Sequence, residues 1–131
     1  MTSEVMDPVT PRPEDEAMTA YGLAHLHDPD LNEDVVDYID RIQATMDPFG
    51  GRFLAHGPDV RVVEGAWPGT VVLLAFPDAD AATAWYESEA YQAILPKRTR
   101  HIHGDVIIFD GVPEGYDATR TAAHYRAALA S

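Results

Sequence analysis

Two pairs of histidines stand at positions that suit acid–base or metal chemistry. His25 is followed by His27, and His101 by His103. Side chains two residues apart on a β-strand leave the same face, so each pair presents two imidazoles to one side. We expect His25 to act as a general base, because imidazole titrates near neutral pH. The alternative is a zinc, copper or iron site in which all four imidazoles converge and one coordination position stays open.

A further candidate for acid–base chemistry is Glu64, which lies close to Trp67 in the sequence. A carboxylate beside an indole loses hydration, which raises its pKa towards the range of a general acid or base. The alternative role is structural, because ion-pair networks also perturb the pKa of a carboxylate. In that role Glu64 holds an interface together by pairing with Arg52, Arg61 or Arg98.

A local cluster of positive charge suits the binding of an anion. Lys97, Arg98 and Arg100 are three of the nine basic residues and lie within four positions. Arginine grips a carboxylate or phosphate by two parallel hydrogen bonds, so Arg98 is the main candidate contact for a small substrate, with Arg52 and Trp67 as further candidates. The alternative, which we favour for the cluster, is that cations at a helix end oppose the helix dipole and pair with acids. For Trp67 the alternative is a place in the core.

The charge balance excludes whole classes of partner. Nine Lys and Arg residues against 22 Asp and Glu residues give the 131-residue chain a formal net charge of -13. Such a charge repels phosphate backbones and anionic lipid, so we expect neither nucleic acid nor a membrane surface as a partner. The absence of cysteine excludes disulfides and thiolate catalysis. Without a visible secretory leader or membrane-spanning apolar run, we expect a cytoplasmic protein.

The elements that must position these groups follow from the apolar patterns. Strands are expected over residues 20–27, 52–64, 71–76 and 104–110. Proline at position 58 predicts a bend in the second strand. After the first strand, apolar residues recur at helical spacing, namely Leu31, Val35, Ile39, Ile42 and Met46. Asp78 is expected to cap a second helix that buries Trp85, and Ser88 a short third helix that ends before Pro96.

The order β-α-β-β-α-β is that of a ferredoxin-like fold of the α+β class. Its antiparallel four-stranded sheet has the spatial order 4-1-3-2, which places the fourth strand beside the first and brings the histidine pairs together. Helices cover only one face of such a sheet, and a second copy of the chain is the simplest cover for the other. We therefore expect a homodimer whose two sheets enclose a shared interior.

The chain is expected to contain one folded domain with two extensions. Residues 1–17 are an acidic, Pro-rich tail, which we expect to be flexible. Residues 18–112 form the ferredoxin-like domain, since a chain of this length builds one sizeable core. Residues 113–131 are expected to form a C-terminal helical extension.

Four segments together resemble one known family. These segments are GGRFL, VEGAW, FPDADAATAWYESEAYQ and DVIIFDG, and the resemblance covers roughly Ala20 to Val112. The chain is similar here to the family named domain of unknown function 1330, which belongs to the dimeric α/β-barrel proteins. The resemblance implies the ferredoxin-like fold, the dimer and a motif position for Glu64, but no reaction. The wider superfamily includes cofactor-free monooxygenases, small isomerases and cyclases, and haem-binding enzymes. The tail and the last helix extend beyond the usual domain.

Three functions remain open at this point. The first is an enzyme that acts on a small organic molecule without a cofactor, with Glu64 or His25 as acid or base and Arg52 or Arg98 as the contact for an anion. The second is a non-catalytic dimer that binds a metabolite or a protein. The third is a metal-dependent enzyme at the histidine cluster. A cavity of ligand size with Glu64 facing into it favours the first function over the second, whereas a closed interior packed with Leu, Val and Phe favours the second.

Overall fold

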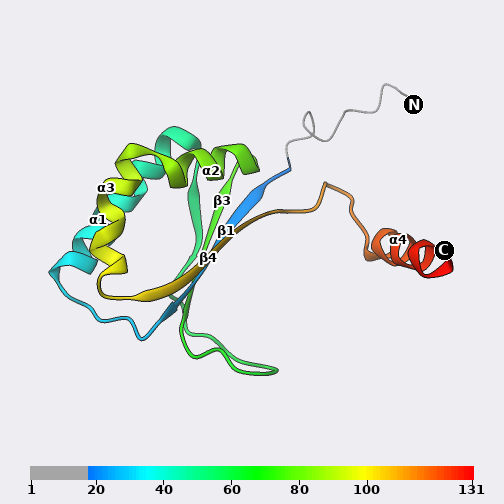
Figure 1. Cartoon of the computed structure of the whole chain (residues 1–131), viewed down its shortest axis with the longest axis horizontal. Coiled ribbons are helices and arrows are strands. Elements are labelled where there is room, and N and C mark those ends of the chain that lie inside the picture. Colours follow the sequence, from blue (N-terminus) through cyan, green and yellow to red (C-terminus); the bar gives the residue numbers. More distant parts are fainter. Residues whose placement is uncertain (1–17) are drawn as a thin grey trace. The chain divides into compact units, whose positions relative to one another are not determined.

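The computed structural model describes residues 18–131, and the predicted flexible tail over residues 1–17 lies outside the described residues. The strands are β1 (Ala20–His27), β2 (Arg52–His56), β3 (Thr70–Phe76) and β4 (His103–Asp110). The helices are α1 (Glu33–Met46), α2 (Ala79–Glu87), α3 (Glu89–Thr99) and α4 (Ala118–Ala130), with a 3-10 turn η1 (Asp47–Phe49). Figure 1 shows their arrangement.

The strands form one antiparallel sheet in the order β2-β3-β1-β4. This is the predicted order 4-1-3-2 read from the other edge. The predicted α+β ferredoxin-like fold, with its additional C-terminal helix, is therefore confirmed. Two connections contain helices: α1 links β1 to the edge strand β2, whereas α2 and α3 together link β3 to the other edge strand, β4.

Helices α1, α2 and α3 cover one face of the sheet (Figure 1). The core between them is built from large side chains, namely Tyr38, Ile42, Met46, Leu74, Phe76, Trp85, Tyr91 and Ile94. The predicted apolar face of α1 is wrong at Leu31, which precedes the helix and is 73% exposed, and it omits Tyr38, which is only 8% exposed. Val35, Tyr38 and Ile42 follow the spacing of three and four residues that one helix face requires.

The helix starts agree with the sequence, but one helix end does not. Asp78 accepts a hydrogen bond from the Ala81 amide, and Ser88 accepts one from the Tyr91 amide, as side-chain caps do. The prediction that α3 ends before Pro96 is wrong, because the helix continues to Thr99 with Pro96 inside it. This extra turn places Arg98 on the helix.

The second strand is much shorter than predicted. It ends at His56 instead of Glu64, and residues 57–69 form a loop that extends away from the sheet (Figure 1). Gly57 adopts a left-handed conformation with φ +64° and donates its amide proton to the Val71 carbonyl. Pro58 has no amide proton to continue the ladder, so pairing stops there.

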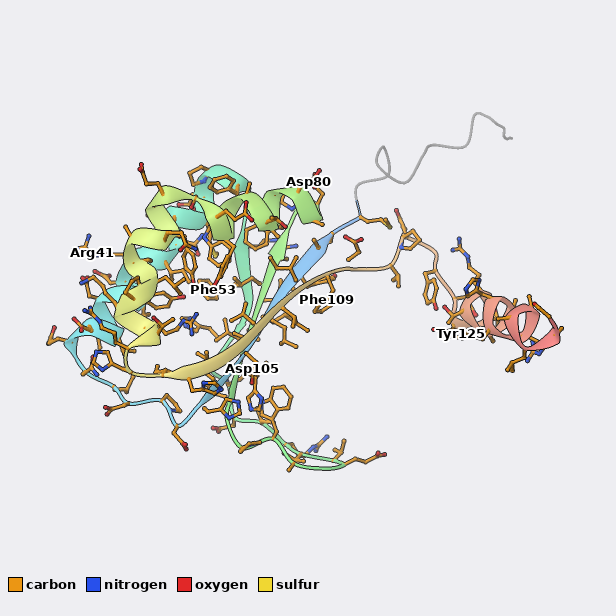
Figure 2. The ribbon with its side chains drawn as sticks, in the orientation of Figure 1. Arg41, Phe53, Asp80, Asp105, Phe109 and Tyr125 are labelled. Atoms are coloured by element: carbon orange, nitrogen blue, oxygen red, sulfur yellow. The ribbon has the colours of Figure 1, made fainter. Side chains whose placement is uncertain are left out.

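The second face of the sheet, called here the open face, carries alternate residues of each strand. Tyr21 pairs across strands with Phe109, and Leu23 with Ile107, so these four side chains share that face. Within residues 19–111 no helix covers it, and Ile107 and Phe109 are exposed. Figure 2 shows Phe109 on the side of β4 that faces away from the helices.

Residues Thr19–Gly111 form one compact unit, and residues from Val112 onward belong to a separate one. In that second unit Asp117 caps α4 by accepting a hydrogen bond from the Thr119 amide. No residue of α4 is buried. None of the helices described between residues 18 and 131 has the length and apolar character needed to cross a membrane.

Candidate functional site

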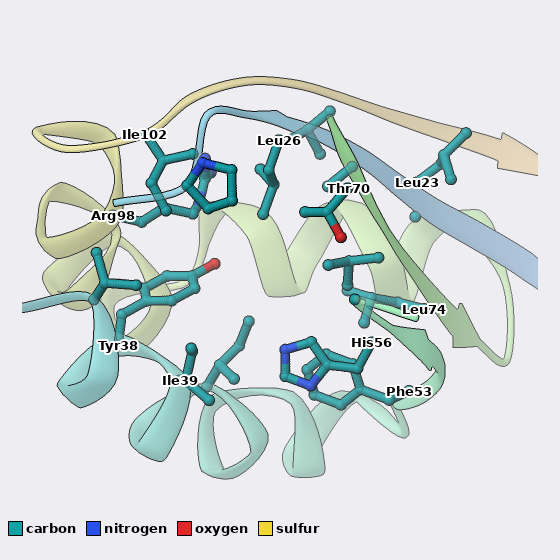
Figure 3. Close-up of a pocket in the computed structure, with 18 of the residues that line it drawn as sticks. Leu23, Leu26, Tyr38, Ile39, Phe53, His56, Thr70, Leu74, Arg98 and Ile102 are labelled. Carbon is teal, nitrogen blue, oxygen red and sulfur yellow. The ribbon is translucent and has the colours of Figure 1, made fainter. Parts of the chain in front are cut away.

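A cavity of about 260 Å³ lies between the sheet and the helices α1 and α3. Figure 3 shows it with Tyr38 and Ile39 on one helix, Arg98 on the other, and Phe53, Thr70 and Leu74 on the strands. Its lining is mostly apolar and includes no Asp or Glu among the described residues. The predicted interior was a space between two sheets, whereas this cavity belongs to a single chain and lies on the helix side.

Arg98 is the one cation in the lining of this cavity within residues 18–131. Tyr91, Ile94 and Arg98 are spaced by three and four residues and form the buried face of α3. Arg98 is 6% exposed, and its guanidinium carbon lies 5.6 Å from the centre of the Tyr38 ring. This distance fits a cation–π contact, which favours a planar guanidinium over a lysine ammonium.

The neighbours of Arg98 in sequence point elsewhere. Lys97 pairs with Asp37 at 3.2 Å, and Arg100 pairs with Asp34 at 3.5 Å, both on α1. For these two cations the structure agrees with the interpretation as a helix end that pairs with acids. The helical turn between them directs Arg98 inward, so the basic cluster divides into two surface ion pairs and one buried guanidinium.

Two buried tyrosines complete the polar part of the cavity. The hydroxyl oxygens of Tyr38 and Tyr91 lie 2.6 Å apart. Burial, followed by the neighbouring Tyr38 hydroxyl, raises the pKa of Tyr91 far above its usual value. Tyr91 therefore stays a phenol at neutral pH and serves as a hydrogen-bond donor, not as a base. The sequence did not single out either tyrosine, although Tyr91 shares helical spacing with Arg98.

No carboxylate among the described residues forms an ion pair with Arg98. Burial by itself lowers the pKa of a guanidinium, but the two tyrosine hydroxyls together outweigh it and raise the pKa of Arg98. The side chain therefore remains charged inside a largely apolar cavity. A buried charge without a counter-charge is costly, and an anion that enters the cavity removes this cost.

His56 lies at the wall of the same cavity, at the end of β2. Its ring stacks on Phe53 with 4.4 Å between centres and 15° between planes. Figure 3 shows the two rings together, across the cavity from Arg98. The His56 side chain is exposed. The bulge between Phe53 and Ala55 turns it towards the helices.

A second group of polar side chains lies on the open face. His25 pairs across strands with Asp105, and His27 with His103. His27 Nε2 lies 3.0 Å from an Asp105 carboxylate oxygen, and the ring centres of His27 and His103 are 5.4 Å apart. The hydrogen bond from His27 lowers the pKa of Asp105 below its usual value. The β1–β4 pairing thus brings three of the four predicted histidines together.

The fourth predicted member of the cluster, His101, lies elsewhere. It precedes β4, and its Nε2 lies 3.0 Å from a carboxylate oxygen of Asp34 on α1. The prediction that all four imidazoles converge is wrong, because the strand that would set the spacing of two begins only at His103. Asp105 takes its place in the group, since it follows His103 by two residues and shares its face.

Trp67 covers this group from the β2–β3 loop. Its indole stacks on the His25 ring with 3.9 Å between centres. His25 Nε2 accepts a hydrogen bond from the Gly69 amide at 3.1 Å. The Trp67 indole nitrogen is buried and has no hydrogen-bond partner among the described residues. Trp67 therefore does not line the cavity, whereas Trp85 is a core residue that contacts it.

Glu64 and Arg52 are not brought to either group. Glu64 is exposed in the loop after β2, instead of standing at a strand end as predicted. Arg52 is exposed on β2 and pairs across strands with Ala75. Neither forms an ion pair within residues 18–131. Of the predicted substrate contacts, the structure places Arg98 alone in the cavity.

The fold is shared with solved structures of low sequence identity. The chain is similar to the RPA0582 protein of unknown function from Rhodopseudomonas palustris, with a TM-score of 0.58 and 14% identity over 79% of this chain and 96% of that one. It is also similar to SnoaB, a cofactor-independent oxygenase from Streptomyces nogalater, with a TM-score of 0.51 and 12% identity over 77% of this chain and 100% of that one.

A third similar structure is a dimeric ferredoxin-like protein of unknown function from Thermobifida fusca, with a TM-score of 0.51 and 16% identity over 73% of this chain and 93% of that one. No curated protein matches the sequence. A family model does match, over residues 19–112, which is the segment that contains the sheet, its three covering helices, the cavity and the histidine group. The chain therefore belongs to the family described as domain of unknown function DUF1330.

Proposed function

We propose that this protein binds, and transforms without a cofactor, a small organic anion in the cavity between the sheet and α1 and α3. The observation that carries the proposal is Arg98, a buried guanidinium with no carboxylate partner among residues 18–131, at the wall of an apolar cavity. A ligand with one acidic group supplies the missing counter-charge.

The lining defines the class of ligand. Apolar side chains of α1, β1, β3 and β4 surround most of the volume of about 260 Å³, so the body of the ligand is apolar or aromatic and small. The acidic group, a carboxylate or an acidic enol or phenol, is expected to lie at Arg98, where Tyr91 and Tyr38 offer hydroxyl groups. Such a site binds the anionic form of the ligand more tightly than the neutral form.

The same geometry favours chemistry that passes through an oxyanion. Donors fixed around a buried position stabilise negative charge that develops on oxygen during enolisation, cyclisation or cofactor-free oxygenation. His56, across the cavity, is the candidate base, because the lining contains no carboxylate. Support by likeness is limited to the fold that this chain shares with SnoaB. The alternative is a protein that binds such an anion without transforming it.

Binding is tested with aromatic carboxylic acids and their uncharged carboxamides, by calorimetry and by the shift of the melting temperature. The acids are expected to bind and the amides are not. Arg98→Met is expected to weaken binding of the acids by about 10- to 100-fold, the loss typical of a charged hydrogen bond. Arg100→Met is the matched control, because Arg100 pairs with Asp34 outside the cavity. Equal affinity for acids and amides, or equal loss in both variants, contradicts the proposal.

Catalysis and simple binding are separated by following a bound acid or enol over time by mass spectrometry, in air and without oxygen. Conversion that slows in His56→Asn while binding is kept supports an enzyme with His56 as base. Tight binding with no conversion under either condition supports the non-catalytic alternative. Glu64 and His25, the acid–base residues expected from the sequence, remain predictions for a site outside this cavity.

The open face suggests that the protein is also a homodimer. Tyr21, Leu23, Ile107 and Phe109 form an apolar surface on a sheet whose other face is already covered, and a dimeric ferredoxin-like protein is among the similar structures. Sedimentation of the full chain is expected to give a dimer. Ile107→Asp is expected to give a monomer that keeps its secondary structure. Thr83→Asp, on the exposed side of α2, is the control and is expected to remain a dimer. A monomeric native protein contradicts this second proposal.

A further inference from the structure

The histidine group on the open face is independent of the cavity, because it lies on the opposite side of the sheet. His25 and His27 leave the same face of β1, and their cross-strand partners on β4 are Asp105 and His103. Four side chains that all carry metal-ligating atoms therefore form a two-by-two patch. Figure 2 shows Asp105 on the side of β4 that faces away from the helices.

The ligand atoms of three residues in the patch lie close together. One ligand atom from each of His25, His27 and Asp105 lies within 4.8 Å of the other two. A tetrahedral ion with bonds of about 2.0 to 2.2 Å holds its ligand atoms about 3.4 Å apart, so small side-chain rotations bring these three atoms into range of one ion. The His25 and His27 rings are already close, with 4.1 Å between their centres.

We propose that His25, His27 and Asp105 bind one divalent first-row transition-metal ion, with His103 as the nearest further imidazole. Two imidazoles and one carboxylate suit zinc, iron, cobalt and nickel better than magnesium or calcium, which prefer oxygen ligands. Three protein ligands leave coordination positions for water or a small ligand, as in catalytic rather than structural metal sites.

The surroundings of the site are consistent with a cation. The chain carries a net charge of -13, which raises the local concentration of divalent ions. In the single chain the side chains of His27 and Asp105 are 28% and 64% exposed, so an ion reaches them without unfolding of the sheet. His25 Nε2 accepts the Gly69 amide proton, and coordination through this nitrogen replaces that hydrogen bond. Metal binding therefore also loosens the loop that carries Trp67.

The experiment is a titration of the full chain, purified without a histidine tag, with Zn²⁺ and with Co²⁺. Calorimetry with Zn²⁺ is expected to give one ion per chain, and Co²⁺ is expected to give visible absorption from a nitrogen- and oxygen-ligated ion. His27→Ala and Asp105→Asn are each expected to weaken Zn²⁺ binding by at least about tenfold, a loss found even for outer-shell partners. Circular dichroism checks that both variants keep the fold.

His124→Ala is the matched control, because His124 lies on α4 in the other unit. This variant is expected to bind Zn²⁺ as tightly as the native chain does. The proposal is overturned if the native chain binds less than one ion, or if His27→Ala and Asp105→Asn bind as tightly as the control. Failure here leaves the proposed anion site untouched, since Arg98→Met is expected to keep Zn²⁺ binding unchanged.

Discussion

The hydroxyl oxygens of Tyr38 and Tyr91 lie 2.6 Å apart and join α1 to α3 at the end of the cavity that holds Arg98. Both tyrosines are buried, and the guanidinium of Arg98 lies against the Tyr38 ring. The three side chains therefore form one polar contact inside an otherwise apolar layer. This contact joins the two helices and places two hydroxyl groups beside Arg98 at the wall of the cavity.

Removal of one hydroxyl is expected to destabilise the fold. Tyr91→Phe leaves the buried Tyr38 hydroxyl without this partner and is expected to lower the free energy of unfolding by about 1 to 3 kcal/mol, measured by urea denaturation. Tyr86→Phe is the control, because the Tyr86 hydroxyl has no hydrogen bond within residues 18–131, and a change below about 0.5 kcal/mol is expected. A similar change in both variants contradicts the role given to the tyrosine pair.

Trp85 is expected to be the most costly side chain to remove from the helix layer. It is 3% exposed, packs on Phe76 and Tyr91, and donates a hydrogen bond to Thr45 Oγ1 at 3.0 Å. Trp85→Ala removes these contacts and is expected to lower the free energy of unfolding by about 3 to 5 kcal/mol. A change below about 0.5 kcal/mol, the usual range for a surface residue, would falsify this core assignment.

Gly69 is expected to tolerate no side chain. A Cβ atom at this position would lie 2.2 Å from the Leu26 carbonyl oxygen and 2.8 Å from His25 Nε2. Gly69→Ala is expected to cost about 1 to 3 kcal/mol in unfolding free energy, as overpacking does, and to change Trp67 fluorescence by separating the loop from His25. In Gly22→Ala the new atom meets Leu74 at an ordinary 3.7 Å, so a much smaller cost is expected. An equal loss of unfolding free energy in Gly69→Ala and Gly22→Ala would argue against close packing of the β2–β3 loop on β1.

The ion pairs of Asp34 predict a pH dependence of stability. A hydrogen bond from His101, together with the charges of Arg100 and Lys97, lowers the pKa of Asp34 below 3.8. Because the folded state binds this proton less tightly than the unfolded state, the contribution of Asp34 is complete above about pH 4 and is lost as the pH falls through the folded pKa.

Asp34→Asn is therefore expected to be less stable than the native chain at pH 7, with a difference that shrinks as the pH falls below 4, followed by thermal unfolding at each pH. Asp80→Asn is the control, because Asp80 also stands in the first turn of a helix but forms no ion pair among the described residues. A difference at pH 7 that persists unchanged after the pH has fallen through the folded pKa of Asp34 would assign the effect to something other than charge, since the carboxylate is then protonated.

The sequence by itself determined the architecture. Apolar runs of strand length, the caps Asp78 and Ser88, and the order β-α-β-β-α-β lead to the observed sheet order, because these signals are local and the connections leave few ways to pair the strands. The pairing of His25 and His27 with a histidine on β4 also followed, since strand periodicity fixes which residues share a face.

Only the tertiary structure decided which charged side chains lie close to one another. Arg98, Lys97 and Arg100 look alike as a cluster in sequence, and only the continuation of α3 past Pro96 sends one of them into the cavity and the others to α1. Asp105 lies in the histidine group because of the β1–β4 register, and Glu64 lies in a loop because β2 ends at His56. Strand ends and register are set by long-range pairing and not by local residue type. Burial depends on what another part of the chain places nearby, and this information is absent from any single segment.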